Sequence, residues 1–338
     1  MKAVILRAPP SLDKLDIVEL PPPPPPGPGE IQVRIRACSL NFHDLAVAVG
    51  ALPVAPPRIP LSDAAGEVAA IGEGVEEFVA GDRVISTFFP TWHDGPPSRS
   101  ASFAATPGDG VDGFAREIVN APASWFTRQP RGFSHAEAAA LPCAGVTAWR
   151  AIVVNGALKA GDSVLTQGAG GVSLFALQLA KAMGARVIAT SSSEEKLSRL
   201  KALGADQVIN YRSHPDWARL ANAYTDGVGV DHVVDVGGAG TLEQSCAAAR
   251  IGGHIHMIGL LGGPQGAVGP MHLLSKQLRI SAVLVGNRRH QLDLVQALEA
   301  TGVRPALDQD FPLDRLADAL RRMQSGAHFG KITVSVAP

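Results

Sequence analysis

Apolar residues in the first 120 positions gather into short runs that glycine and proline separate. These runs are Ala3–Leu6, Ile31–Ala37, Ala65–Ile71 and Arg83–Ser86. Short apolar runs bounded by turn residues are typical of β-strands. The first part of the chain is therefore predicted to be β-rich.

Two segments of this part interrupt the pattern. Pro21–Pro26 cannot form a helix or a central strand, so it predicts a stiff extended connector, with a PxxP ligand for an adaptor domain as the alternative. Pro90–Gly113 is rich in Pro, Gly, Ser and Asp and predicts a long loop. Loops of that length inside compact domains are usually functional or mobile.

From Ala157 onward the pattern changes to alternating strands and helices. The predicted strands are Ser163–Gln167, Arg186–Ser191, Gln207–Asn210, Asp231–Val236 and His254–Leu260. The predicted helices are Val172–Met183, Glu194–Leu203, Asp216–Tyr224 and Thr241–Ala249. This alternation predicts an α/β architecture, a doubly wound parallel sheet with crossover helices. A last helix, Asp314–Ser325, and a last strand, Lys331–Val336, are expected to return to the first domain.

Length, charge and cysteine content narrow the class of protein. A chain of 338 residues suggests two domains, and a net charge of -1 gives no reason to expect nucleic acid or a membrane as a partner. No apolar run reaches the length of a membrane span, and the first residues do not resemble a signal peptide. Three cysteines are too few for a disulfide framework. We expect a cytoplasmic protein with a small-molecule substrate.

The most informative segment joins the strand Ser163–Gln167 to the helix that follows it. The turn reads Gly168-Ala-Gly170-Gly171-Val172-Ser173. Glycines let a backbone turn sharply and approach a pyrophosphate, and the helix N-terminus offers free N–H groups to its charge. We therefore expect Gly168, Gly170, Gly171 and Val172 to contact a dinucleotide, with an ordinary glycine-rich turn as the alternative.

The end of the next strand distinguishes NADP from NAD. An NAD enzyme would place Asp or Glu there to bind the ribose hydroxyls. This chain has Thr190-Ser191-Ser192-Ser193, followed by Glu194, Glu195 and Lys196, so no acid sits at the strand tip. Ser191, Ser192 and Lys196 could bind a 2′-phosphate, and Tyr211 could flank the adenine, so NADP(H) is the predicted cofactor. Alternatively, Ser193 serves as the N-cap of the next helix, and both roles can coexist.

Several motifs together resemble the medium-chain dehydrogenase/reductase superfamily. They include the segments Asn41–Leu45, Gly66–Val84, Leu141–Trp149 and His328–Ile332, besides the glycine turn. The likeness is greatest to the zinc-independent branch of alcohol dehydrogenase-like and quinone oxidoreductase-like proteins. It implies a GroES-like catalytic domain of residues 1–121 and 288–338 and a Rossmann domain of residues 122–287, with the active site between them.

The positions that hold catalytic zinc in relatives differ here. Asn41 replaces the first cysteine, Leu61-Ser62-Asp63 replaces a GHE motif, and only Cys143 remains. One thiol cannot hold a catalytic zinc, which needs about three protein ligands. His43, His93 and His135 have no spacing that resembles a zinc site. No metal is therefore predicted.

Without a metal, another group must stabilise the negative charge that develops as hydride arrives. Asn41 can donate a hydrogen bond, Thr147 could assist, and Asp44 is a candidate titratable group. Conjugated acceptors suit such a site, which favours reduction of quinones or enones. The tyrosine that related quinone oxidoreductases carry is here Ala46. We predict that an apolar wall of the substrate pocket is formed by Phe88, Trp92 and Phe114. Alternatively, these three residues pack in the core.

The resemblance also implies roles for residues later in the chain. It implies that Gly259, Leu260, Asn287 and Lys331 lie near the nicotinamide, and that a homodimer forms through the edge strand Leu278–Gly286. The predicted activity is NADPH-dependent reduction of quinones, enones or related acceptors. A metal-free alcohol dehydrogenase or carbonyl reductase, and a non-catalytic NADPH-binding sensor, remain alternatives.

Overall fold

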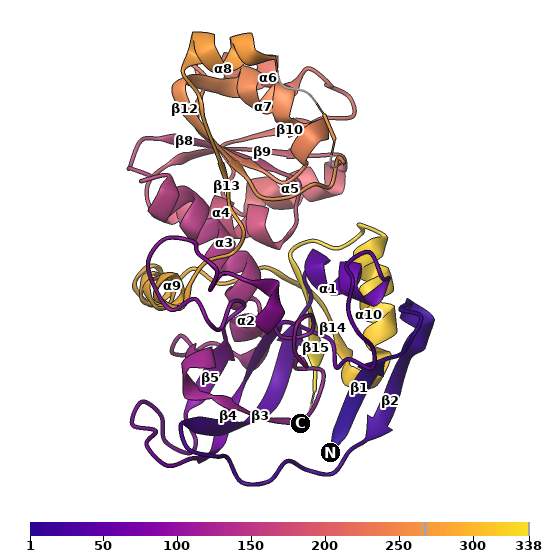
Figure 1. The fold of residues 1–338 in the computed structure, drawn as a ribbon. Helices are drawn as coiled ribbons and strands as arrows, with labels where there is room; N and C mark the ends of the chain where they lie inside the picture. The colour runs from indigo at the N-terminus through magenta and orange to yellow at the C-terminus, as the bar shows by residue number, and fades with distance from the viewer. Residues whose placement is uncertain (264, 267–268, 337–338) are drawn as a thin grey trace. The chain divides into compact units, whose positions relative to one another are not determined.

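The structure, a computed structural model, describes residues 1–263, 265–266 and 269–336. It consists of two compact units, Met1–Val146 with Val285–Pro338, and Thr147–Leu284 (Figure 1). The first boundary lies at residue 146, whereas the sequence suggested 121. The reason is that strand β7 (Phe126–Arg128) pairs with β5 (Arg83–Ser86) and so extends the sheet of the first unit.

The first unit is built mainly of strands, as predicted. Its remaining strands are β1 (Lys2–Leu6), β2 (Leu15–Glu19), β3 (Glu30–Ser39), β4 (Asp63–Ile71), β6 (Ile118–Pro122), β14 (Leu307–Pro312) and β15 (Lys331–Ser335). Its helices are α1 (Phe42–Ala48), α2 (His135–Ala139), α9 (Arg288–Thr301) and α10 (Leu316–Gln324). The main sheet has the order β14-β15-β3-β4-β5-β7, β6 pairs with β3, and β1 pairs with β2.

The C-terminal segment completes the first unit, as the sequence suggested. Strand β15 runs antiparallel to β3, with Val334 opposite Cys38 and Thr333 opposite Ser39. The side chains of Val334, Cys38 and Ile332 lie in the apolar core of this unit. The pairing places Lys331, at the start of β15, beside the end of β3.

The second unit has the alternating order predicted for a doubly wound fold. Its strands are β8 (Ser163–Gln167), β9 (Arg186–Ser191), β10 (Gln207–Asn210), β11 (Val230–Asp235), β12 (Ala249–Met257) and β13 (Arg279–Ala282). Its helices are α3 (Val146–Trp149, the first residue of which belongs to the other unit), α4 (Gly171–Ala182), α5 (Glu194–Ala202), α6 (Trp217–Ala223), α7 (Leu242–Ala248) and α8 (Pro270–Lys276). All pairs of the sheet, ordered β10-β9-β8-β11-β12-β13, are parallel.

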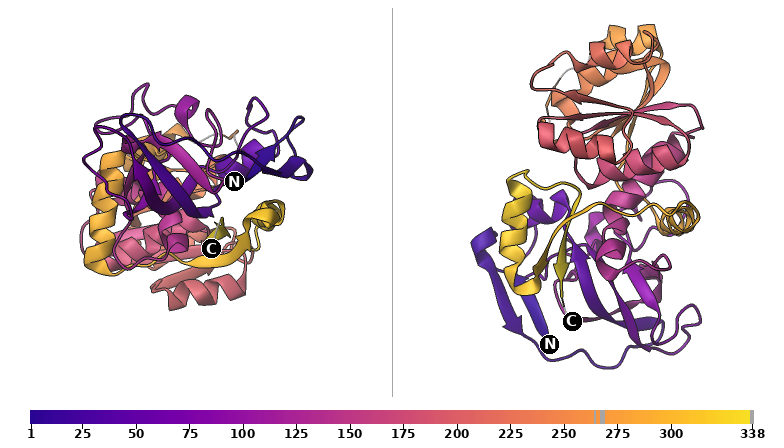
Figure 2. Two further views of the ribbon diagram at one scale, coloured as in Figure 1. Left: turned by 90° about the horizontal axis from the view of Figure 1, so that it is seen from below. Right: turned by 180° about the vertical axis from the view of Figure 1, so that it is seen from behind.

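Helices cover both faces of this sheet, as the right-hand view of Figure 2 shows with the sheet nearly edge-on. Val233 and Ile255 point to the face that α6 and α7 cover, where they pack with Trp217 and Cys246. Because successive side chains of a strand point to opposite faces, the residues flanking Val233 and Ile255 belong to the face that α4 covers.

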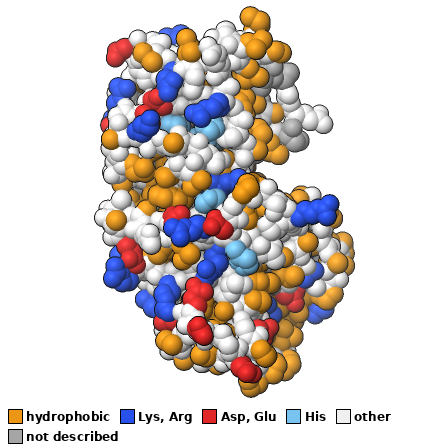
Figure 3. Space-filling view, turned by 60° about the vertical axis from the view of Figure 1, so that its left-hand side comes forward, with side chains coloured by type: hydrophobic (Ala, Val, Ile, Leu, Met, Phe, Trp, Pro, Cys, Tyr) orange, Lys and Arg blue, Asp and Glu red, His pale blue; other side chains and the backbone are white. Residues whose placement is uncertain are grey.

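The charged side chains of one face and the apolar character of the helices bear on the sequence-based expectations. Basic and acidic side chains are interspersed over the face seen in Figure 3, in keeping with the small net charge. No helix in the described part of the chain is both long and apolar enough to span a membrane.

The close pairing of β3 and β4 leads to a first prediction. A Cβ atom on Gly66 would lie 2.2 Å from the backbone oxygen of Arg34, so Gly66→Ala must push two paired strands apart. We expect the free energy of unfolding to fall by about 1–3 kcal/mol, as it does at other overpacked sites. Thermal unfolding would measure it. The control is Gly27→Ala, whose Cβ meets only the flexible end of Glu30 at 3.3 Å. Equal melting temperatures for the two variants would show that the close approach at Gly66 does not limit stability.

Candidate active site

The turn between β8 and α4 has the geometry expected of a dinucleotide loop. Gly168 has a φ of 73°, a conformation that glycine adopts without strain, and Gly170 caps the N-terminus of α4. A Cβ atom on either glycine would meet no heavy atom within 4 Å. The space beside the turn is therefore open. Gly171 and Val172 form the first turn of α4, where backbone N–H groups have no partner within the helix.

The packing of α4 against β8 depends on a small third residue in this motif. Ser173 is buried, and its hydroxyl donates to the backbone oxygen of Gln167 at 2.6 Å. The serine thus fits where glycine is usual. The loop fits a pyrophosphate, with open space in front and N–H groups beside it.

The ends of β9 and β10 lie next to this turn. The Gly168 N–H donates to the Thr190 oxygen at 2.8 Å, and the Tyr211 N–H donates to the Ser191 oxygen at 3.1 Å. The structure therefore brings Gly168, Ser191 and Tyr211 together at the carboxyl ends of the parallel strands. The Tyr211 side chain is exposed.

The tip of β9 is polar but carries no carboxylate. Ser191 is buried and Ser192 half-buried there. The Ser193 hydroxyl accepts the Lys196 N–H at 3.4 Å, which is the capping role considered from the sequence. Lys196 itself lies on the first turn of α5, after Glu194 and Glu195.

A buried polar network supports the loop after β11. Asp235 accepts the N–H groups of Gly237 at 3.0 Å and Gly238 at 2.8 Å. The Gln167 amide, at the end of β8, donates to the same carboxylate at 3.3 Å. The Thr241 hydroxyl donates to it at 2.8 Å. The network fixes the ends of the two central strands relative to each other.

Gly259 and Leu260 follow β12, also at the carboxyl ends of the strands. A Cβ atom on Gly259 would lie 2.5 Å from the Val236 oxygen, so close packing of two loops already requires this glycine. The Leu260 side chain is 56% exposed, which leaves its surface available to a ligand.

A second group of polar residues lies inside the first unit. The Lys331 ammonium donates to the Asn41 side-chain oxygen at 2.6 Å and to the Leu40 backbone oxygen. The Asn41 amide nitrogen donates to the Ser62 hydroxyl at 3.1 Å. Asn41, Ser62 and Lys331 are all buried. The structure thus places Lys331 against Asn41, a contact that the sequence did not predict.

Asp44 holds the two backbone segments of this group together. Its carboxylate accepts the Asn41 N–H at 2.7 Å and the Ser62 N–H at 2.9 Å. Both oxygens are therefore bonded to backbone groups at the start of α1 and before β4. Burial raises the pKa of Asp44, and the nearby His43 opposes this shift. This arrangement suits a positioning residue.

Asp63 is the functional candidate that sequence reasoning missed. It is fully buried, its Oδ2 accepts the Cys143 N–H at 3.1 Å, and its Oδ1 has no hydrogen-bond partner among the described residues. Burial raises the pKa of Asp63 to about 7, although the nearby Lys331 ammonium and the Asn41 amide lower it. Desolvation dominates because the carboxylate is fully buried. We considered Asp63 in the sequence only as a replacement for a zinc-binding motif.

The donor set around Asn41 does not fit a catalytic zinc ion. Amide and hydroxyl groups stand at Asn41 and Ser62, where relatives have zinc-binding cysteine and histidine, and only Asp63 and Cys143 could act as zinc ligands. In addition, the Lys331 ammonium lies at hydrogen-bond distance from Asn41 and repels a second cation.

The three aromatic residues suggested for a substrate pocket are buried. Phe114 lies in the main core, with its ring 6.0 Å from that of Phe126. Phe88 packs against Phe89 at 4.8 Å, and the Trp92 ring nitrogen donates to the Gly95 oxygen at 3.1 Å. These contacts agree with the core alternative, and the pocket role stays a prediction.

Two other predicted residues lie on or beside helices. Asn287 caps α9, because its side-chain oxygen accepts the His290 N–H at 2.8 Å and its amide nitrogen donates to the Gly95 oxygen. Thr147 is buried in α3, in the second unit. Their roles toward cofactor and substrate stay predictions.

The raised pKa of Asp63 predicts how stability depends on pH. The folded protein binds the Asp63 proton more tightly than the unfolded chain does, because the pKa of Asp63 is about 7 in the folded state and 3.8 otherwise. The protonated carboxyl therefore stabilises the fold at low pH, and this stabilisation is lost as the pH rises through 7. Between about pH 5 and pH 8 the free energy of unfolding of the parent protein should fall by about 2.5 kcal/mol because of Asp63. The Asp63→Asn variant should not show this fall. Urea unfolding of both proteins across this range measures the difference, in which the histidine contributions cancel. Parallel curves would show that Asp63 is ionised throughout.

Family models and curated relatives match both halves of the chain. An alcohol dehydrogenase GroES-like domain matches residues 27–131, and a zinc-binding dehydrogenase domain matches residues 171–301. A zinc-type alcohol dehydrogenase-like protein of Schizosaccharomyces pombe is 40% identical over 310 residues, 89% of each chain. A chloroplast envelope quinone oxidoreductase homolog of Arabidopsis thaliana is 30% identical over 88% of this chain and 87% of its own length.

Solved structures of related proteins also resemble this chain. A protein of Sinorhizobium meliloti 1021 described as an alcohol dehydrogenase has 41% identity and a TM-score of 0.93, over 99% of this chain and 98% of its own. An NAD-dependent alcohol dehydrogenase has 35% identity and a TM-score of 0.91 over the whole of both chains. A mycobacterial protein in complex with NADPH has 28% identity and a TM-score of 0.82, over 99% of this chain and all of its own. The chain therefore belongs to the medium-chain dehydrogenase/reductase superfamily, whose members are oxidoreductases that bind a nicotinamide cofactor.

Proposed function

We propose that this chain is a metal-independent, NADP(H)-dependent oxidoreductase that transfers hydride to quinones, enones or related activated acceptors. The observation that carries the proposal is the tip of β9, where Ser191 and Ser192 stand in place of a carboxylate and Lys196 follows on the first turn of α5, after Glu194 and Glu195. A carboxylate at this point would repel the 2′-phosphate of NADP, whereas hydroxyl groups and an ammonium attract it.

Residues of the second unit would hold the dinucleotide. Gly168, Gly170 and the first turn of α4 would bind the pyrophosphate, and Tyr211 would cover the adenine. Among the relatives, one is NAD-dependent and another is a complex with NADPH, so the serine-rich tip is the feature that favours NADP(H) here. When bound, the reduced nicotinamide supplies the hydride.

The polar group of the first unit would stabilise the charge on the acceptor. Addition of hydride to a quinone or enone leaves negative charge on oxygen, and a donor fixed in advance stabilises it. One N–H of the Asn41 amide bonds to Ser62 and the amide also interacts with the Asp63 carboxyl, so an acceptor would compete with Asp63 for the second N–H. The Lys331 ammonium polarises this amide through its oxygen and so strengthens the N–H as a donor.

Asp63 couples this group to pH. A carboxyl with a pKa of about 7 changes its charge close to neutral pH. In its neutral form it no longer offsets the Lys331 charge, which only Asp44 then opposes among the carboxyls of this group, and the polarisation of Asn41 is stronger. In its ionised form it attracts the ammonium and weakens that effect.

We also propose a homodimer in the cytoplasm. Strand β13 forms one edge of the sheet in the second unit, within the predicted pairing segment Leu278–Gly286. An unpaired edge offers N–H and C=O groups to the same strand of a second copy. The three cysteines are free thiols, as expected for a reducing compartment.

Turnover assays test the reaction itself. NADPH oxidation with a panel of quinones and enones should be faster than NADP⁺ reduction with simple alcohols, because only conjugated acceptors spread the developing charge. Turnover of simple alcohols alone would instead indicate a metal-free alcohol dehydrogenase. Cofactor binding without any turnover would indicate a sensor.

Lys196→Ala tests the cofactor preference. Loss of a charged hydrogen bond to the 2′-phosphate should weaken NADPH binding by about 10- to 100-fold. NADH binding should stay unchanged, because NADH lacks this phosphate. Titration calorimetry with both cofactors measures the effect. Lys201→Ala is the matched control on the same helix, where the ammonium bonds to the Asp206 backbone. Equal losses for both cofactors would refute the role of Lys196.

Asn41→Asp tests the donor on the acceptor side. The new side chain keeps an oxygen for Lys331 but has no N–H to donate. We expect kcat/KM for the acceptor to fall by about 100-fold or more, as at sites that lose one such donor, and NADPH affinity to stay unchanged. Asn120→Ala, on β6, is the control. Unchanged turnover in the Asn41 variant would exclude this residue as the donor.

A further inference from the structure

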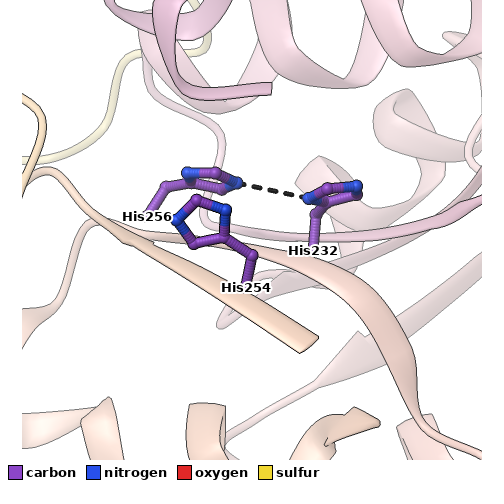
Figure 4. A group of neighbouring side chains, drawn as sticks. All are labelled: His232, His254 and His256. Atoms are coloured by element: carbon purple, nitrogen blue, oxygen red, sulfur yellow. Dashed lines mark hydrogen bonds between the residues drawn. The ribbon is translucent and has the colours of Figure 1, made fainter. Parts of the chain in front are cut away.

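Three buried histidines meet on the central strands of the second unit, outside every site described above. His232 lies on β11, and His254 and His256 lie on β12. His232 is directly opposite His254 in the ladder, and His254 and His256 share a face because they are two residues apart. Figure 4 shows the three rings gathered on one side of the two strands.

The rings are close enough to share a ligand. The Nδ1 atom of His232 and the Nε2 atom of His256 share a hydrogen bond of 3.3 Å, and the ring centroids of His254 and His256 are 4.0 Å apart. One nitrogen from each ring lies within 4.8 Å of the others. Three imidazole nitrogen atoms thus lie close together, an arrangement that the order of residues in the sequence does not reveal.

The group is incompletely satisfied by the protein itself. All three side chains are buried, and the Nδ1 atoms of His254 and His256 have no hydrogen-bond partner among the described residues. Buried nitrogen atoms without a partner are costly, and neighbouring positions of the same strands carry Val233, Val234 and Ile255. Apolar packing alone would be served better by apolar residues.

We propose that His232, His254 and His256 bind one divalent transition-metal ion, zinc in the first place, with a water molecule as fourth ligand. Imidazole nitrogen suits zinc, copper or nickel rather than magnesium or calcium. Two nitrogens on a tetrahedral zinc are about 3.4 Å apart, given bonds of about 2.0–2.1 Å. The separation between His232 and His256 already meets this value. Small ring rotations bring in His254.

The rings are in the form that binds metals. Burial lowers the pKa of His254 to about 4 and that of His256 to about 2, and burial also lowers the pKa of His232. Their nitrogen lone pairs are therefore not taken by a second proton at neutral pH. The charge of nearby Arg279 contributes to these shifts and opposes a cation, so the ligands must supply the affinity.

Second partners orient two of the three rings. The Nε2 atom of His232 lies 3.5 Å from the Asp162 carboxylate, and the Nε2 atom of His254 lies 2.8 Å from the Ser281 hydroxyl. Metal-bound histidines usually donate their other N–H to such groups, and the carboxylate offsets part of the ion's charge. Asp162 precedes β8, so the ion would link three neighbouring strands.

The expected role is structural, because no residue assigned to the dinucleotide or the acceptor belongs to the group. At a free zinc concentration of 100 times Kd, the melting temperature should rise by roughly 5–10 °C. NADPH affinity should not change. This inference does not rest on the proposed function, and its failure would leave that function untouched.

The experiment uses the full chain, purified without a histidine tag and freed of metal by a chelator. Equilibrium dialysis against zinc, followed by elemental analysis, should find one ion per chain. Cobalt should give the intense visible absorption of a tetrahedral site. Thermal unfolding with and without zinc should show the predicted shift.

Three variants test whether the ion binds at these histidines. His256→Leu should lose zinc binding by more than 100-fold, and thermal unfolding of its metal-free form checks that the variant is folded. Asp162→Asn should bind zinc about 10- to 100-fold more weakly. His214→Ala, at an exposed position of the same unit, is the control and should bind normally.

Two results would overturn the proposal. One is a parent protein that retains no zinc or cobalt after dialysis and shows no thermal shift. The other is a His256→Leu variant that binds zinc as tightly as the parent, because the ion would then lie elsewhere.

Discussion

The buried ammonium of Lys331 is the constraint on which the first unit's polar group depends. A charge removed from water needs acceptors around it, and Lys331 finds them in the Leu40 backbone and the Asn41 side chain, 290 residues earlier in the chain. This contact joins β15 to the start of α1. Asn41 in turn bonds to Ser62, so one cation aligns three segments distant in the sequence.

The second unit solves a related problem with a carboxylate. Asp235 is buried without a cation and is satisfied by backbone N–H groups of Gly237 and Gly238, by hydroxyl groups and by Gln167. These bonds shape the loop at the carboxyl edge of the sheet, where Gly168 also turns. Both units therefore use saturated buried polar groups to hold loops in place, and rigid loops are what a bound dinucleotide or acceptor requires.

The fold of the second unit could largely be predicted because its signals are local. Strands β8, β9 and β10 lie where their patterns predicted, and Gly204 has the positive φ expected after α5. Helix α9, in contrast, was missed, since the sequence placed its residues only within the returning C-terminal segment. The early boundary was misplaced because the pairing of β7 with β5 is a long-range contact, which local periodicity does not report.

Prediction of the sites had the same limit. The glycine turn and the serine-rich strand tip are contiguous, so the sequence indicates their chemistry. The contact between Lys331 and Asn41, and the burial that shifts the pKa of Asp63, depend on which strands become neighbours. The three histidines are a further case: His254 and His256 share a face by spacing alone, but His232 joins them only because β11 pairs with β12.

The two polar clusters differ in a way that decides what each can do. Around Asn41, the Asn41 and Ser62 oxygens already have internal donors, and a fixed ammonium supplies positive charge that opposes a second cation, although one Asp63 oxygen has no partner among the described residues. Around His256, no cation is fixed in the cluster, and the Nδ1 atom of His254 has no partner among the described residues, which leaves a ligand atom for an ion. The number of potential ligands is therefore a poor guide to metal binding in this chain. What matters is whether the protein has already satisfied them.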